Sequence, residues 1–136
     1  MDYLCEDKWQ LSFDEEIAVK KQLKTYFVKH ITDNTFIAVF AEIDGVVVST
    51  AYLAISEKPA NPSFITGVTG VLLNVLTYPE HRRKGIATKV INRIIDEAKA
   101  VGVSRIDLSA TDDGMYLYEK MGFEKSNYAT MGLKLI

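Results

Sequence analysis

The sequence has little of what several specialised classes of protein require. Its 136 residues include one cysteine, Cys5, and two histidines, so an internal disulfide is impossible and a zinc site has too few ligands. A lone cysteine is typical of a reducing compartment and favours a cytoplasmic location. No apolar run reaches the roughly 18 residues of a membrane-spanning helix. Residues 1–7 lack the basic start and apolar stretch of a signal peptide, so none is expected.

An excess of basic residues is also absent. The chain has 16 Lys and Arg against 18 Asp and Glu, a formal net charge of −2 at pH 7, which argues against nucleic acid as the main partner. Hydrophobic residues make up 48% and charged residues 25%, the proportions of a folded globular protein, and they exclude a disordered chain. No linker or repeat divides the sequence, so we expect a single domain over residues 1–136.

The first half of the chain is predicted to hold a helix and a hairpin. Ser12 opens a Ser-x-x-Glu capping box, and apolar residues then recur at helical spacing, which predicts a helix over 13–31. The dipeptide Asp44-Gly45 is favoured in two-residue hairpin turns. It separates two runs rich in β-forming residues, at 35–43 and 46–55.

The second half alternates strands with helices. A strand is predicted over 68–78, and its segment 71–76 is so uniformly apolar that both of its faces are expected to be buried. The other predicted elements are a helix over 85–101, a strand over 105–109, a short helix over 113–121 and the last strands within 123–136. Strand, helix and strand in succession imply a parallel crossover. We therefore predict an α/β fold, a mixed sheet with helices on both faces.

The most informative segment is a basic loop between the apolar strand and the second helix. Arg82, Arg83 and Lys84 precede Gly85, where the helix is expected to begin. The free N–H groups and the dipole of a helix start favour an anion, and a glycine lets a ligand approach the backbone. A solvated charged turn is the alternative reading of such a run. The position of the loop between a strand and a helix favours a pyrophosphate site.

Three motifs here resemble the GNAT superfamily of N-acetyltransferases. Arg82-x-x-Gly85-x-Ala87 matches its Arg/Gln-x-x-Gly-x-Gly/Ala signature. Residues 74–82 resemble the family's fourth strand and the coenzyme A loop that follows, and residues 117–123 resemble its Leu-Tyr-Glu-Lys-Leu-Gly-Phe segment. The resemblance covers residues 35–136. It implies a GNAT-like fold in which two parallel strands splay apart around acetyl-CoA.

The resemblance also implies roles for individual residues. Backbone groups of Val75, Leu76 and Thr77 would pair with the pantetheine arm, and the N–H of Leu76 would stabilise the oxyanion. Tyr118 matches the tyrosine beside the thioester sulfur, where its phenol would act as general acid toward the leaving thiolate. A core aromatic is the alternative for Tyr118. The residues expected to wrap the pyrophosphate are Arg82, Arg83, Lys84, Gly85, Ile86, Ala87 and Thr88.

Some positions depart from the family's pattern or stay open. Thr111 stands where the family often has an Asn that contacts the cofactor arm, and residues 1–12 look too short and polar for its first strand. No general base is evident. The polar residues left open between a structural and a catalytic role are Asn74, Glu80, His81 and Asp107. Trp9 is read as a packing residue, and nothing makes Cys5 a nucleophile.

The sequence therefore predicts an N-acetyltransferase that transfers the acetyl group of acetyl-CoA to a primary amine by direct attack, with no metal. The acceptor could be a small amine, a polyamine, an amino acid, an aminoglycoside-like compound or a protein amine. The alternatives are a non-catalytic CoA-binding regulatory module and the transfer of a longer acyl group. No membrane partner is expected. A homodimer is expected, because a short N-terminus leaves apolar surface uncovered.

Overall fold

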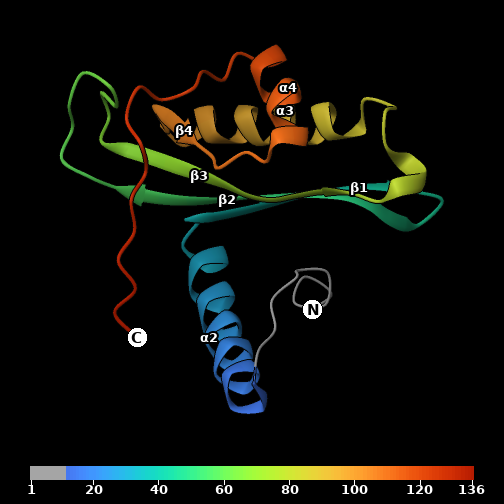
Figure 1. Ribbon diagram of the computed structural model, residues 1–136, viewed down its shortest axis with the longest axis horizontal. Coiled ribbons are helices and arrows are strands. Elements are labelled where there is room, and N and C mark those ends of the chain that lie inside the picture. The colour runs from blue at the N-terminus through green and yellow to red at the C-terminus, as the bar shows by residue number, and fades with distance from the viewer. Residues whose placement is uncertain (1–11) are drawn as a thin grey trace.

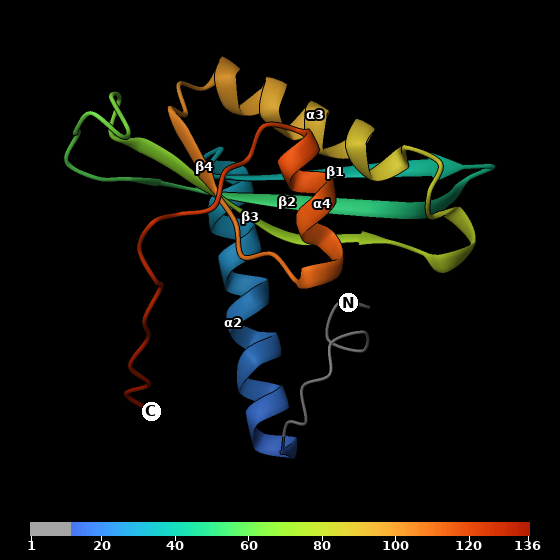
Figure 2. The same cartoon turned by 45° about the horizontal axis from the view of Figure 1, so that its top comes forward.

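The computed structural model describes residues 12–136, which form one sheet with helices on both faces (Figure 1). Helices α3 and α4 cover one face, while α2 stands against the other and projects away from it (Figures 1 and 2). Within the described residues, no helix combines the length and the apolar character needed to cross a bilayer. The elements are α2 (Phe13–Thr32), β1 (Phe36–Ile43), β2 (Val46–Glu57), β3 (Val68–Thr77), the 3-10 turn η1 (Pro79–His81), α3 (Ile86–Ala100), β4 (Arg105–Asp107) and α4 (Asp112–Lys120).

The sheet is mixed, with the strand order β1-β2-β3-β4. The first two pairings are antiparallel and the pairing of β3 with β4 is parallel, which confirms the predicted α/β fold. Asp44 and Gly45 form the turn between β1 and β2 with φ angles of 52° and 78°. Two positive φ values in a two-residue loop are typical of a type I′ turn, so the predicted hairpin is confirmed.

The parallel pair is short. It joins Thr69 to Arg105, Gly70 to Ile106 and Val71 to Asp107, where β4 ends, two residues before the predicted end of that strand. The second half of β3 runs on to Thr77, and within the described chain no strand lies beside it on that edge. The backbone groups along that edge are therefore left for another partner.

The core lies between the sheet and α3. Apolar residues recur along one face of α3 and pack onto β2, β1 and β3, which places the helix across the sheet. Gly70 allows this packing, since a Cβ at that position would lie 2.8 Å from Cδ1 of Leu53. The buried cluster consists of Ala51, Leu53, Leu72, Val90, Ile91, Ile94 and Ala98.

The opposite face of the sheet is only partly covered. The rings of Tyr26 and Phe27 on α2 pack against Phe36, with centroids 5.6 and 5.2 Å apart, at one end of the sheet. Farther along β3, Val71 is 41% exposed and Leu73 is 40% exposed. The prediction that both faces of 71–76 are buried is therefore wrong, because α2 contacts only the end of the sheet near Phe36 and then leaves it.

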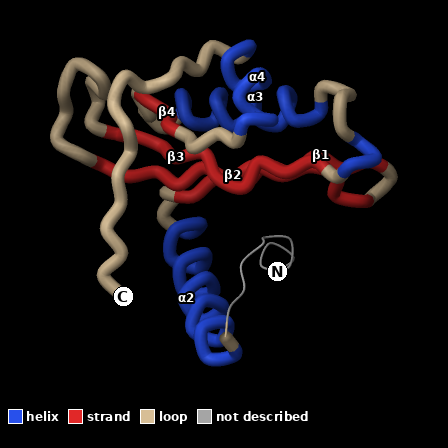
Figure 3. Tube along the Cα trace, viewed as in Figure 1, coloured by secondary structure: helices blue, strands red, loops and turns tan. Residues whose placement is uncertain are grey.

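The last predicted strands are also absent. Residues 124–136 form no helix or strand, and Figure 3 shows them as a loop that leaves α4 and runs past the sheet to the side of α2. No described strand pairs with this segment. The other predicted helices and strands are confirmed, with ends that shift by one or two residues.

Candidate active site

A β-bulge interrupts β3 just beyond its pairing with β4. The pairing with β2 places Tyr52 opposite Leu73 but Thr50 opposite Leu76, so β3 gains one residue. Asn74 takes up the extra length with a φ of 50°, and its carbonyl oxygen accepts a hydrogen bond of 3.2 Å from Thr50 Oγ1. Bulges of this kind redirect the groups that follow them.

The hydrogen bonds after the bulge show toward which edge of β3 each backbone group is directed. The carbonyl oxygen of Leu76 accepts from Ser49 Oγ at 2.9 Å, and the N–H of Tyr78 donates to a carbonyl of β2 at 3.0 Å. Both residues therefore direct their backbone groups toward β2. Because successive residues of a strand direct these groups to opposite edges, those of Val75 and Thr77 face the open edge.

The loop after β3 is hydrogen-bonded to the end of that strand. Arg82 Nε donates to the carbonyl oxygen of Thr77 at 2.9 Å, and the N–H of Arg82 donates to the carbonyl oxygen of Pro79 at 3.3 Å. Arg83 and Gly85 both have left-handed backbone, with φ values of 64° and 75°. The loop therefore turns sharply twice before α3 begins. Nδ1 of His81, beside this loop, is buried and has no partner within residues 12–136.

The start of α3 differs from the starts of the other long helices. At α2 the Ser12 hydroxyl accepts from a helix N–H, and at α4 the Thr111 hydroxyl does the same; both first turns carry acidic residues. At α3 Gly85 offers no side-chain cap and the first turn has no acidic residue. The free N–H groups at Ile86, Ala87 and Thr88 and the positive end of the helix dipole are thus left without an anion from the described chain.

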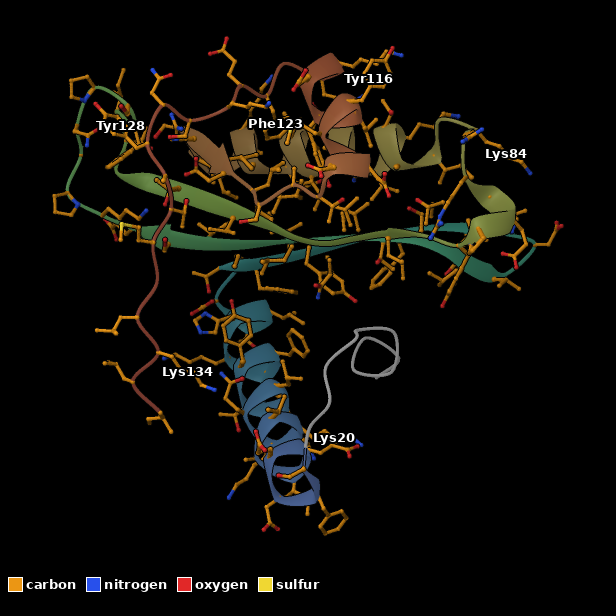
Figure 4. The ribbon with its side chains drawn as sticks, viewed as in Figure 1. Lys20, Lys84, Tyr116, Phe123, Tyr128 and Lys134 are labelled. Carbon is orange, nitrogen blue, oxygen red and sulfur yellow. The ribbon has the colours of Figure 1, made fainter. Side chains whose placement is uncertain are left out.

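The surroundings of this helix start are open and basic. A Cβ built on Gly85 meets no atom of residues 12–136 within 4 Å, so the described chain leaves space beside its backbone. Arg83 and Lys84 are exposed, and Figure 4 shows Lys84 at the outer end of the loop, directed away from the sheet. This arrangement suits a phosphate group, which needs N–H donors and positive charge together.

Tyr118 lies on α4, on the same side of the sheet as α3 (Figures 1 and 2). It is half-buried against the core cluster, and its ring meets Phe123 edge-on with centroids 5.8 Å apart. Gly114, one turn earlier, leaves room for the ring, since a Cβ there would lie 3.3 Å from Tyr118 Cε2. Burial raises the pKa of the Tyr118 hydroxyl, so the phenol keeps its proton well into the alkaline range.

The structure assigns structural contacts to several residues that the sequence left open. Thr111 caps α4, its Oγ1 accepting from the N–H of Gly114 at 3.3 Å. Asp107 Oδ1 accepts from Arg105 Nε at 2.9 Å. Glu80 lies in η1 and is exposed. The positions of Cys5 and Trp9 lie outside the described residues.

Sequence reasoning missed the bulge and the bond between Arg82 and the end of β3. The signal for the bulge was Asn74 itself, because Asn tolerates left-handed backbone and is out of place in an apolar strand. No comparable signal in the sequence predicted that the Arg82 side chain would bond to the carbonyl oxygen of Thr77.

Comparison with known proteins agrees with this geometry. A predicted acetyltransferase from Clostridium acetobutylicum, solved with acetyl-CoA, is 29% identical; the match covers 97% of this chain and 82% of that one, with a TM-score of 0.81. A GCN5-related N-acetyltransferase from Ralstonia eutropha is 24% identical over 86% of this chain and 77% of its own, with a TM-score of 0.74. Glucosamine-6-phosphate N-acetyltransferase from Arabidopsis thaliana is 18% identical over 96% and 83%, with a TM-score of 0.66.

The two less identical structures share the fold. The sequence profile of the family described as Acetyltransferase (GNAT) matches residues 3–123, which is most of the chain. That match spans the bulged strand, the basic loop, α3 and the helix that carries Tyr118. The chain therefore belongs to the GNAT family of acetyltransferases.

Proposed function

We propose that this acetyltransferase transfers the acetyl group of acetyl-CoA to a primary amine, as a single domain in the cytoplasm and as a homodimer. The observation that carries the proposal is the uncapped, basic start of α3 beside the open edge of β3. The Clostridium acetobutylicum structure, which contains acetyl-CoA, supports the same ligand. The two features suit the two ends of such a molecule, an anionic pyrophosphate and an amide-rich arm.

The pyrophosphate would lie on the loop and first turn at residues 82–88. The N–H groups at Ile86, Ala87 and Thr88 would donate to it, and Arg83 and Lys84 would add positive charge. Gly85 would let the phosphates approach the backbone, since no atom in the described part of the chain lies within 4 Å of a Cβ built there. The side chain of Arg82, bonded to Thr77, would hold the loop in place rather than grip the phosphates.

The pantetheine arm would add to the sheet as a strand does. The carbonyl oxygen of Val75 and the N–H of Thr77 face the open edge of β3 and would pair with the amides of the arm, since the Thr77 carbonyl already accepts from Arg82. The N–H of Val75 would then be available for the oxyanion of the tetrahedral intermediate. The family resemblance implies the N–H of Leu76 for the oxyanion. The Leu76 carbonyl is directed at β2 by its bond from Ser49, so we assign the oxyanion contact to the N–H of Val75 instead.

Tyr118 would supply the proton that the departing thiolate needs. Attack by the amine nitrogen forms the new C–N bond, and collapse of the intermediate breaks the C–S bond and leaves CoA as a thiolate. A phenol is a suitable donor to a thiolate, whose conjugate thiol has a pKa of about 8.5. Because burial raises the pKa of Tyr118, the phenol is fully protonated at the pH where the acceptor amine begins to lose its proton.

The proposal is tested in two steps. Acetyl-CoA should raise the melting temperature of the protein by mass action, because it binds the folded state. The protein, acetyl-CoA and a broad panel of primary amines should then release free CoA thiol. Absence of a thermal shift at millimolar acetyl-CoA would overturn the proposal. A shift without thiol release would favour the regulatory module, and faster turnover of a longer acyl-CoA would favour transfer of that group.

Two glycines provide a matched pair of variants. Gly85 and Gly102 lie at opposite ends of α3, both have positive φ, and a Cβ at either meets no atom within 4 Å. Gly85→Glu should abolish the thermal shift, because it places bulk and negative charge where the phosphates lie. Gly102→Glu carries the same backbone strain and charge and should keep the shift. An equal loss of binding in both variants would show that general destabilisation, not the site, explains the result.

A further inference from the structure

Two neighbouring hydroxyls of β2 hold the carbonyl groups of the residues before and after Val75. Thr50 Oγ1 donates to the carbonyl oxygen of Asn74 at 3.2 Å, and Ser49 Oγ donates to the carbonyl oxygen of Leu76 at 2.9 Å. Because successive residues of a strand face opposite sides of the sheet, one hydroxyl reaches β3 from each face. Both carbonyls are therefore directed at β2.

The opposite ends of the same two peptide groups are the donors that the proposed function uses. In a trans peptide the C=O and the N–H point in opposite directions, and no cis peptide bond occurs in residues 12–136. A carbonyl of Asn74 that is directed at β2 therefore directs the N–H of Val75 at the open edge. In the same way, the bond to Leu76 directs the N–H of Thr77 at that edge.

The bulge makes the peptide group between Asn74 and Val75 dependent on its side-chain bond. Neither residue has a partner in the register of β3 against β2, because the extra residue of a bulge is left outside the ladder. The bond from Thr50 thus fixes an orientation that the register of the two strands does not fix.

Ser49 belongs to a chain of hydrogen bonds that reaches the basic loop. It is 1% exposed, and its Oγ also lies 2.9 Å from Oγ1 of Thr77, the residue opposite it in the register. Since the Leu76 carbonyl can only accept, Ser49 uses its single proton there and the Thr77 hydroxyl donates to Ser49. The Thr77 carbonyl in turn accepts from Arg82. The pair of hydroxyls therefore anchors the end of β3 between β2 and the loop.

We propose that Thr50 and Ser49 are positioning residues with separate roles, an inference that rests on the proposed function. Thr50 directs the N–H of Val75 at the oxyanion, and Ser49 directs the N–H of Thr77 at the pantetheine arm. The oxyanion forms only on the way through the transition state, whereas the arm is bound throughout the reaction. Loss of the first hydroxyl therefore lowers kcat, and loss of the second weakens the binding of acetyl-CoA.

The role of Thr50 is tested by removing its hydroxyl while keeping the shape of the side chain, in Thr50→Val. We expect kcat to fall by roughly 10–100-fold, because a misdirected oxyanion donor loses much of its effect, with little change in the KM for acetyl-CoA. Thr50→Ser restores a hydroxyl and should recover most of the wild-type kcat. A wild-type kcat in Thr50→Val, or a Thr50→Ser enzyme that is equally slow, would overturn this role.

The role of Ser49 is tested by Ser49→Ala, whose effect should appear in KM rather than in kcat. We expect the KM for acetyl-CoA to rise by roughly fivefold or more, the contribution of about one hydrogen bond. Because this change leaves the Thr77 hydroxyl without its acceptor, a second variant combines it with Thr77→Val, which removes both hydroxyls together.

Ser56→Ala is the matched control for Ser49→Ala. Ser56 lies on the same strand, with its Oγ 3.3 Å from Thr69 Oγ1 at the other end of the pairing of β2 with β3. It should keep the wild-type kcat and KM. An unchanged KM in both Ser49 variants, or an equal rise in Ser56→Ala, is incompatible with the role of Ser49.

Amide resonances of the protein without ligand test the positioning apart from the chemistry. In two-dimensional NMR spectra, Thr50→Val should shift the amide signal of Val75 more than that of Thr77, and Ser49→Ala should do the reverse. Equal shifts of the two amides in both variants would overturn the inference. Wild-type protein that releases no CoA thiol would count against the proposed function alone, because the amide shifts are measured without acetyl-CoA.

Discussion

Tyr118 combines a hydroxyl suited to proton transfer with a ring that packs on Phe123. Tyr118→Phe removes the hydroxyl and keeps the ring, so we expect the KM for acetyl-CoA to change little and kcat to fall by roughly 10²–10⁴-fold. The wild-type rate should rise with pH as the amine becomes neutral. It should fall only at a pH above the ordinary range of a phenol, because burial raises the pKa of Tyr118, and the variant should lack this fall. Steady-state kinetics across pH check this; a wild-type rate in the variant would make Tyr118 a packing residue.

Gly114 provides a second, less direct way to perturb the same hydroxyl. Alanine favours a helix over glycine by up to about 1 kcal/mol, so Gly114→Ala should keep or raise the melting temperature. Its Cβ would stand 3.3 Å from Tyr118 Cε2 and would push the ring by a fraction of an ångström. We expect kcat to fall by roughly tenfold or more, because catalytic groups tolerate little displacement. Higher stability with unchanged kcat would show that the ring need not be held so closely.

The helices α2 and α4 begin with the same kind of hydroxyl cap, but only α4 contains Tyr118. The hydroxyls of Ser12 and Thr111 each accept from a backbone N–H three residues on, at 3.2 and 3.3 Å. Ser12→Ala and Thr111→Ala should each lower the free energy of unfolding by about 1 kcal/mol, measured in urea. Only Thr111→Ala should also lower kcat, because α4 positions Tyr118. Equal kinetic effects would show that activity follows stability alone.

These elements also show what local sequence can and cannot predict. The cap at Ser12, the turn at Asp44-Gly45 and the apolar stripe of α3 all act between residues close in the chain, and the structure confirms each of them. The exposure of Val71 and Leu73 depends on where α2 leaves the sheet, which no local pattern records. The strand expected near the C-terminus failed for a related reason, since a strand needs a neighbouring strand to pair with and residues 124–136 run past the sheet as a loop.

The candidate site also contains features that the sequence predicts and features that it does not. The basic loop and its glycine could be predicted from the sequence because their residue types favour binding of an anion. The family match includes both. The bond from Arg82 to Thr77 and the direction of the Leu76 carbonyl arise from the bulge, which shifts the register of β3 against β2. A one-residue shift moves every following group to the other edge, so the backbone donor could not be assigned from sequence.

The main core cluster lies on one side of the sheet, beneath α3. Leu53, on β2, is fully buried in the cluster beneath α3, whereas Phe40, on the same sheet, is 52% exposed. Leu53→Ala should cost about 2–5 kcal/mol through the cavity it leaves. Phe40→Ala removes a larger side chain yet should cost less, because much of its surface already meets water. Urea unfolding of both variants checks this; a greater loss at Phe40 would place the dominant core on the other face.

The empty space above Gly85 has a consequence for evolution as well as for binding. The fold requires at this position only a left-handed backbone, which Asn and Asp also adopt with modest strain, because a Cβ there meets no atom of residues 12–136 within 4 Å. Under the proposed function, a relative that lost acetyl-CoA binding could carry those residues without losing its structure. A relative that kept the cofactor would keep glycine, so the residue at this position would distinguish the two.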